Sequence, residues 1–125
     1  MTSTVELNME LPDGMITPSL ARTAICSALG NSTASLKHDA ALAISEVVTN
    51  AAIHAGGATK ISAWSRLDSP RLRVEVRDSS TLVPVKRLAT GDDIGGRGMS
   101  IVELVSSNYG SFPVTGGKVV WFELQ

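Results

Sequence analysis

Three polar side chains interrupt an otherwise apolar stretch of the sequence, "AISEVVTNAAIHAGG", residues 43–57. They are Glu46, Asn50 and His54: a carboxylate, an amide and an imidazole at four-residue spacing. On an α-helix this spacing places the side chains one turn apart on the same face. An amide oxygen suits Mg²⁺ that keeps phosphate and water oxygens as its other ligands, and a carboxylate one turn away could orient or deprotonate a nucleophile.

The three side chains fall inside the predicted apolar stripe of this helix. On a helical wheel with about 100° per residue and Leu42 at zero, the apolar residue Ile53 lies at about 20°. The three polar residues lie between about 40° and 120° on the same wheel. Burying a carboxylate, an amide and an imidazole without partners would cost several kcal/mol. We therefore expect them to line a site, and the alternative is an internal hydrogen-bond network that satisfies all three.

A zinc site is not expected on this helix. Glu46 and His54 are eight residues apart, and His38 lies about two to three turns away, which leaves no tetrahedral ligand set within reach.

A second carboxylate is expected at the end of a strand. In "RLRVEVRD", residues 71–78, the apolar residues Leu72, Val74 and Val76 alternate with charged ones, and Asp78 continues the apolar register. Its carboxylate should therefore point to the helix side of the sheet, where it needs a donor. A lysine on a helix, the loop that begins at Ser79–Ser80, or a ligand with an exocyclic amine could supply one.

A glycine-rich segment is the third candidate. In "GDDIGGRGMS", residues 91–100, three glycines (Gly95, Gly96 and Gly98) precede a helix expected to begin near Met99. The free N–H groups of a helix N-terminus can hold phosphates. The segment matches neither the Walker pattern nor the dinucleotide-binding fingerprint, and a flexible turn is the alternative explanation.

The elements that must position these groups follow from the apolar pattern. The alternation in "STVELNMELP" predicts a strand, and Thr17, Pro18 and Gly30 mark the start and stop of a first helix. A second helix is expected from about Leu36 to Ala55. An antiparallel hairpin ("TKISAWSRL" and "RLRVEVRD", joined by "DSPR"), a loop from Ser79 to Gly98, a short helix and a closing strand "GKVVWFELQ" follow. This order predicts an α+β two-layer sandwich with helices on one face of the sheet.

Composition narrows the class of protein. The length of 125 residues is typical of one domain, 1–125. The net charge of −1 lacks the excess of positive charge that usually attracts nucleic acid or an anionic membrane. No apolar run of about 18 residues occurs. The N-terminus shows no secretory signal pattern and Cys26 is the lone cysteine, so we expect a cytoplasmic protein without disulfides.

The motifs taken together resemble a known superfamily. "SEVVTNAAIHAG" resembles the N box of the GHKL (Bergerat-fold) ATPases, "VRDSS" a shortened G1 box and "GGRGMSIVELV" the G2 box with its lid. "GGKVVWFEL" is similar to the final strand of small single-domain members, and the closest group is the bacterial anti-sigma factor/serine-protein kinase family, related to histidine-kinase ATPase domains. The resemblance implies the Bergerat ATP-binding fold, with a mixed, mostly antiparallel sheet.

The resemblance also implies a role for each candidate residue. Glu46 would be the base that activates a hydroxyl, Asn50 would coordinate the Mg²⁺ that bridges the phosphates of ATP, and His54 would line the nucleotide pocket. Asp78 would accept from the adenine amine, with Ser80 beside the base. The lid over the phosphates would comprise Gly95, Gly96, Arg97, Gly98 and Met99.

Members of this group phosphorylate a serine on a small anti-anti-sigma protein of STAS type and bind a sigma factor, usually as homodimers. The resemblance therefore implies an ATP-dependent protein-serine kinase and anti-sigma factor. The alternatives are a switch that binds nucleotide and partner without phosphoryl transfer, and a scaffold that has lost nucleotide binding. Ser80 stands where the G1 box usually has glycine, and Val119 where many members have a threonine that supports the aspartate.

Overall fold

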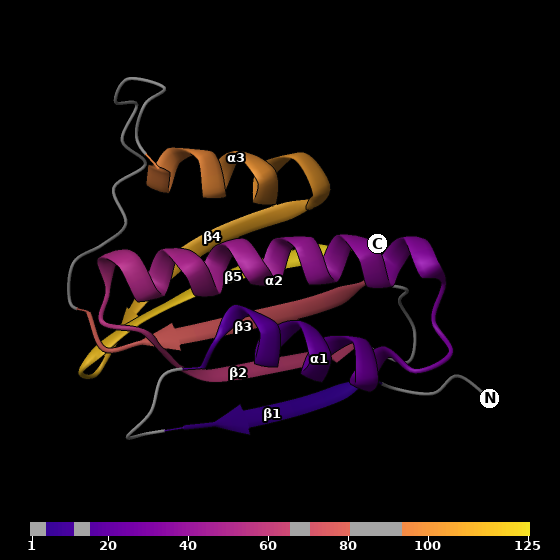
Figure 1. Ribbon diagram of the computed structural model, residues 1–125, viewed down its shortest axis with the longest axis horizontal. Coiled ribbons are helices and arrows are strands. Elements are labelled where there is room, and N and C mark those ends of the chain that lie inside the picture. The colour runs from indigo at the N-terminus through magenta and orange to yellow at the C-terminus, as the bar shows by residue number, and fades with distance from the viewer. Residues whose placement is uncertain (1–4, 12–15, 66–70, 81–93) are drawn as a thin grey trace.

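The described part of the chain forms one sheet and three helices. The computed structural model describes residues 5–11, 16–65, 71–80 and 94–125, with side chains from residue 100 onward in the last range. The elements in chain order are β1 (Glu6–Glu10), α1 (Pro18–Leu29), α2 (Ala34–His54), β2 (Ala58–Ser65), β3 (Leu72–Asp78), α3 (Ile94–Val105), β4 (Asn108–Val114) and β5 (Gly117–Leu124). Figure 1 shows α2 between α1 and α3, with the sheet forming the second layer. The predicted α+β sandwich is confirmed.

The sheet is five-stranded in the order β1-β2-β3-β5-β4, and each of its strand pairs is antiparallel. The predicted mixed sheet is therefore wrong for the described residues. From β1 the chain alternates direction through α1, α2 and β2, so β2 is antiparallel to β1 (Figure 1). From β3 it alternates in the same way through α3, β4 and β5, so β5 is antiparallel to β3.

The helix starts follow local sequence signals. The hydroxyl of Thr17 accepts a hydrogen bond from the N–H of Leu20, Pro18 occupies the first turn of α1, and Gly30 closes the helix at a φ of 51°. These three predictions are confirmed. The second helix begins two residues before the predicted Leu36, because Thr33 caps it in the same way.

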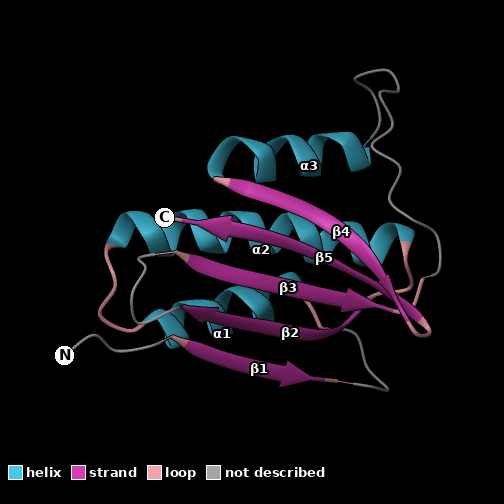
Figure 2. Cartoon of the chain, turned by 180° about the vertical axis from the view of Figure 1, so that it is seen from behind, coloured by secondary structure: helices cyan, strands magenta, loops and turns pink. Residues whose placement is uncertain are grey.

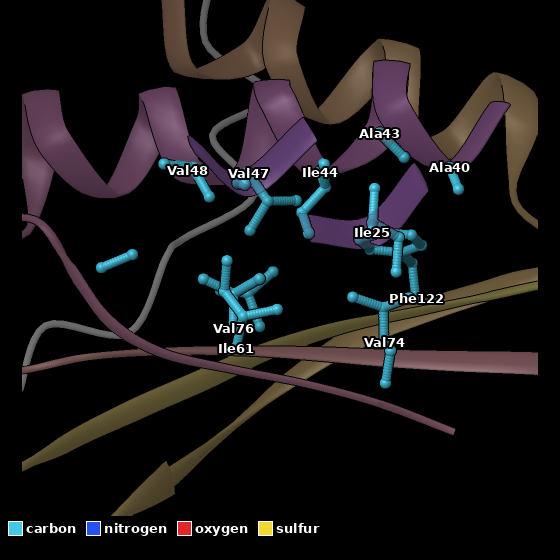
Figure 3. Close-up of a cluster of buried hydrophobic side chains, with 14 of the residues drawn as sticks. Ile25, Ala40, Ala43, Ile44, Val47, Val48, Ile61, Val74, Val76 and Phe122 are labelled. Atoms are coloured by element: carbon cyan, nitrogen blue, oxygen red, sulfur yellow. The ribbon is translucent and has the colours of Figure 1, made fainter. Parts of the chain in front are cut away.

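The core lies between the sheet and the helices α1 and α2. Val74 and Val76 of β3 and Phe122 of β5 face Ile25 of α1 and Ile44 of α2 (Figure 3). All five side chains are at most 1% exposed. Burying a side chain of this size contributes about 1.5–3 kcal/mol to the free energy of unfolding. These five residues therefore stabilise the packing of the helices on the sheet.

One strand was absent from the sequence-based prediction. β4 shows little apolar alternation, contains Gly110 and Pro113, and is half-buried or exposed throughout. Proline cannot donate to a strand ladder and is tolerated at a sheet edge, which is where β4 lies. The predicted turn "DSPR" falls almost entirely outside the described residues.

The second face of the sheet, seen from behind in Figure 2, is not covered by any helix of the described residues. The predicted wet face of β3 is confirmed there: the Arg73 guanidinium pairs with Glu75 at 3.0 Å and with Glu123 at 3.3 Å. The same guanidinium lies 4.0 Å from the ring centroid of Trp121. None of the described helices is long and apolar enough to cross a membrane.

Candidate functional site

Four elements bring the predicted site residues to one end of the sheet. The C-terminal half of α2, the end of β3, the beginning of β5 and the beginning of α3 lie at the same end of the molecule, on the left in Figure 1. Since β3 and β5 are antiparallel neighbours, the last residue of one is paired with the second residue of the other. Segments far apart in the sequence therefore meet here.

The polar residues of α2 flank its buried stripe. The buried stripe consists of Ala40, Ala43, Ile44, Val47, Val48 and Ala51. Glu46 and Asn50 are half-buried and His54 is exposed, while Ile53 is 53% exposed. The prediction that the trio lies inside the apolar stripe is therefore wrong, because the buried stripe is centred on the face toward the sheet and Ile53 is not part of it.

The flank of α2 that carries Glu46 and Asn50 faces α3. On the opposite flank, Ser45 accepts a hydrogen bond from the Arg22 guanidinium of α1 at 3.0 Å. At about 100° per residue, Asn50 lies about 140° from Ser45 around the helix axis. Because α2 lies between α1 and α3 (Figure 1), the polar flank is the one toward α3. Glu46 and Asn50 thus lie one turn apart on the side of α2 that packs against α3.

Asp78 ends β3 in the predicted register, with its side chain 2% exposed. Its Oδ1 accepts a hydrogen bond from the backbone N–H of Ser80 at 2.9 Å, as a loop-capping aspartate does. Its Oδ2 lies 2.8 Å from Nζ of Lys118. The lysine predicted as a partner is therefore present, but it comes from β5 and not from a helix.

Lys118 is a neighbour of the candidate site residue Asp78 that the sequence analysis missed. It is the cross-strand neighbour of Asp78, and its side chain is only 9% exposed. Val119, in contrast, pairs with Arg77 and lines the uncovered face of the sheet. The prediction that Val119 stands beside the aspartate is wrong by one residue. Knowledge of the register between β3 and β5 would have identified Lys118. A shift of this register by one residue moves each side chain of β5 to the other face of the sheet.

A glycine keeps this end of β5 close to Asp78. A Cβ atom at Gly117 would overlap the backbone carbonyl oxygen of Asp78. A glycine is needed here for close approach, and not for a left-handed backbone. The close approach holds the start of β5, and with it Lys118, against the end of β3.

The glycine-rich segment is helical. Gly95, Gly96, Arg97, Gly98 and Met99 form the first turns of α3, which begins at Ile94. The prediction of a loop up to Gly98 and a helix from Met99 is therefore wrong. Residues 81–93 and the side chains of Arg97 and Met99 lie outside the described part of the chain. The first N–H groups of α3 carry the partial positive charge that favours an anion.

The uncovered face of the sheet has a shallow hollow of about 200 Å³. Its lining consists of Lys60, Ser62, Glu75, Arg77, Phe112, Val114 and Val119. None of the predicted site residues lines it. Among the described residues, no three His, Cys, Asp or Glu side chains gather closely enough to hold a metal ion.

The described donors fit a magnesium nucleotide. Asn50 offers a half-buried amide that could ligate Mg²⁺, with phosphate and water oxygens as the other ligands. Asp78 offers a buried carboxylate with one contact on each oxygen among the described residues. The beginning of α3 lies at the same end of the molecule (Figure 1), where its N–H groups could meet phosphates.

Comparison with known proteins identifies the family of the chain. No curated protein matches the chain at a significant level. A family model described as the histidine kinase-like ATPase domain matches residues 17–124, from the N-cap of α1 to the end of β5. The matched span contains each predicted site residue. The chain therefore belongs to the family of histidine kinase-like ATPase domains, as its resemblance to the GHKL superfamily predicted.

Proposed function

We propose that this protein is an ATP-binding regulator that acts as an anti-sigma factor and as a serine kinase on a small anti-anti-sigma partner of STAS type. The observation that carries the proposal is the position of Glu46 and Asn50, which lie one turn apart and half-buried on the flank of α2 that faces α3. A carboxylate and an amide in this position have no packing role that an apolar residue would not fill better. The family match supports the use of ATP.

Each residue has a distinct task in this proposal. When bound, ATP supplies the phosphoryl group and Mg²⁺ neutralises charge on its phosphates. Asn50 would hold the metal through its amide oxygen, and Glu46 would accept the proton of the partner's serine hydroxyl. Asp78 would anchor the base, and His54, exposed at the end of α2, would border the nucleotide. Arg97 and the glycines of α3 would lie over the phosphates.

We also propose that the protein acts in the cytoplasm as a homodimer. It would bind protein partners and make no direct contact with nucleic acid. The uncovered face of the sheet and α1, where Arg22 is exposed, are the surfaces on which we would seek these contacts.

Replacing Glu46 tests the kinase assignment. In Glu46→Gln, transfer of the γ-phosphate of ATP to a co-encoded partner should fall by about 10²- to 10⁴-fold, because the amide cannot take the hydroxyl proton. Binding of Mg-ATP, measured by calorimetry, should be unchanged. Glu103→Gln removes the same charge from an exposed position of α3 and should keep full transfer.

Equal transfer rates in Glu46→Gln and the unmodified protein would rule out Glu46 as the base. A different result would favour a non-catalytic switch: ATP stays intact with every co-encoded partner, yet ATP and ADP give different affinities for that partner. Such a difference is what linkage between the two binding sites requires.

A further inference from the structure

The uncovered face of the sheet has two ends that differ in charge. At one end the described charges compensate one another, because the Arg73 guanidinium lies 3.0 Å from Glu75 and 3.3 Å from Glu123. At the other end is the hollow, which is lined by Lys60 and Arg77. Neither of these two side chains forms an ion pair with a described residue. The positive charge of this face is therefore concentrated at the hollow.

The two cations of the hollow are direct cross-strand neighbours. Lys60 of β2 is paired with Arg77 of β3, and both residues are half-buried. Like charges directly opposite each other on a sheet repel and destabilise the strand pair. Glu10 lies opposite Lys60 on β1, but it is exposed and these two described residues form no ion pair. An anion between Lys60 and Arg77 would remove the repulsion, so this arrangement is suited to binding one.

The Arg77 guanidinium is held in position for such a contact. Its Nη2 donates a hydrogen bond at 2.6 Å to the backbone carbonyl oxygen of Thr115, in the turn between β4 and β5. A guanidinium has five N–H donors, so this bond leaves others for a ligand. Because the group is planar and binds carboxylates through two parallel hydrogen bonds, a fixed orientation favours a carboxylate ligand.

The wall of the hollow beside the two cations is apolar. It is formed by Phe112 and Val114 of β4 and by Val119 of β5, and Phe112 is 38% exposed. The volume of about 200 Å³ is smaller than the roughly 300–1,000 Å³ of a pocket for a drug-sized ligand. The hollow therefore has room for one or two side chains, and its lining matches an acidic residue with an apolar neighbour.

We propose that the hollow binds an exposed segment of a protein partner in which an acidic residue is flanked by apolar residues. The acidic side chain would bridge Lys60 and Arg77, and an apolar neighbour would pack on Phe112. This inference deepens the proposed function, on which it rests for the existence of a protein partner. It states which chemistry the uncovered face recognises in that partner.

The hollow lies on the same two strands as the candidate nucleotide site. Arg77 and Val119 line the hollow. Their chain neighbours Asp78 and Lys118 form the buried ion pair on the helix side of the sheet. A partner segment bound in the hollow would therefore contact the strands that carry the Asp78 carboxylate, from the opposite face.

An NMR titration of the full chain without nucleotide tests the inference. The probe is an acetylated and amidated tripeptide of sequence Leu-Glu-Leu, and the matched control peptide is Leu-Gln-Leu. The acidic peptide should bind in the millimolar range and shift the amide resonances of Lys60, Arg77 and Val119 most. In Lys60→Gln its dissociation constant should rise about fivefold, as expected for the loss of one partly exposed ion pair. Lys37→Gln removes the same charge from α2 and should bind like the unmodified protein.

Equal affinities for the two peptides would overturn the inference, because the charge of the acidic residue would then play no part. Shifts that lie away from the hollow would overturn it too, and so would equal losses in Lys60→Gln and Lys37→Gln. Absence of binding would also overturn it, and a dimer in analytical ultracentrifugation would then identify a second copy of the chain as the occupant. Since the titration contains no nucleotide, none of these results affects the proposed use of ATP, which titration with Mg-ATP tests separately.

Discussion

At the scale of single residues, the ion pair between Asp78 and Lys118 contributes to the stability of the contact between the end of β3 and the start of β5. Lys118→Met would leave the Asp78 carboxylate buried without its cation. We expect the free energy of unfolding, measured by urea denaturation, to fall by about 3–5 kcal/mol. Arg71→Met is the control, because its 3.8 Å contact with Glu123 involves an arginine side chain that is 51% exposed.

The control substitution should cost less than about 1 kcal/mol, as exposed ion pairs do. Equal losses in the two variants would mean that Asp78 finds another donor when Lys118 is removed. The comparison isolates burial as the cause, since both substitutions replace a basic residue with methionine.

At the scale of elements, the hydroxyl of Thr33 holds the beginning of the helix that carries Glu46 and Asn50. It accepts a hydrogen bond from the N–H of Leu36 at 3.2 Å. Thr33→Ala should lower the free energy of unfolding by about 1 kcal/mol, which thermal or urea denaturation can measure. Thr23→Ala makes the same chemical change at an exposed position within α1 and should be neutral or slightly stabilising.

A loss in Thr23→Ala as large as in Thr33→Ala would contradict the capping role. The two caps at Thr17 and Thr33 use the same geometry, a side-chain oxygen that accepts from an N–H three residues later. Only the first was predicted. The proline after Thr17 strengthens its signal, and Thr33 has no such neighbour.

Elements were predictable to the extent that their signals are local. The strands β1, β2, β3 and β5 and the helix α1 follow from alternation, helical periodicity and caps within each segment. β4 was missed because an edge strand buries little and needs no apolar alternation. The start of α3 at Ile94 was missed because three glycines indicate a loop more strongly than a helix.

At the scale of the whole molecule, a ligand that binds only the folded chain stabilises all of it. At a free concentration one hundred times its dissociation constant, Mg-ATP should add about 2.7 kcal/mol to the free energy of unfolding. For a domain of this size that corresponds to a rise in Tm on the order of 10 °C. Differential scanning calorimetry with and without Mg-ATP measures it.

Asn50→Ala should abolish the magnesium-dependent part of this rise, because the proposed protein ligand of the metal is lost. Asn8→Ala, on the exposed face of β1, should keep the full rise. An undiminished rise in Asn50→Ala would place the metal on other ligands. If Tm of the unmodified protein does not rise at millimolar nucleotide, the result would favour a scaffold that has lost nucleotide binding. Glu46 and Asn50 would then be parts of an internal polar network.

The sequence alone determined what depends on neighbours along the chain. The four-residue spacing of Glu46 and Asn50 fixes a common helix face, and the alternation through Val76 fixes the side of the sheet on which Asp78 lies. The order of these motifs was enough to indicate the family. Each inference uses the geometry of a single helix or strand, which is the same in any protein.

Only the tertiary structure decided what meets these residues. Lys118 reaches Asp78 through the register of β3 and β5, two strands joined by a connection that contains α3 and β4. Which flank of α2 faces α3, and whether Ile53 is covered, depends on helices packed from both sides. Such contacts join residues distant in sequence and are fixed by packing across the whole molecule, so no local pattern encodes them.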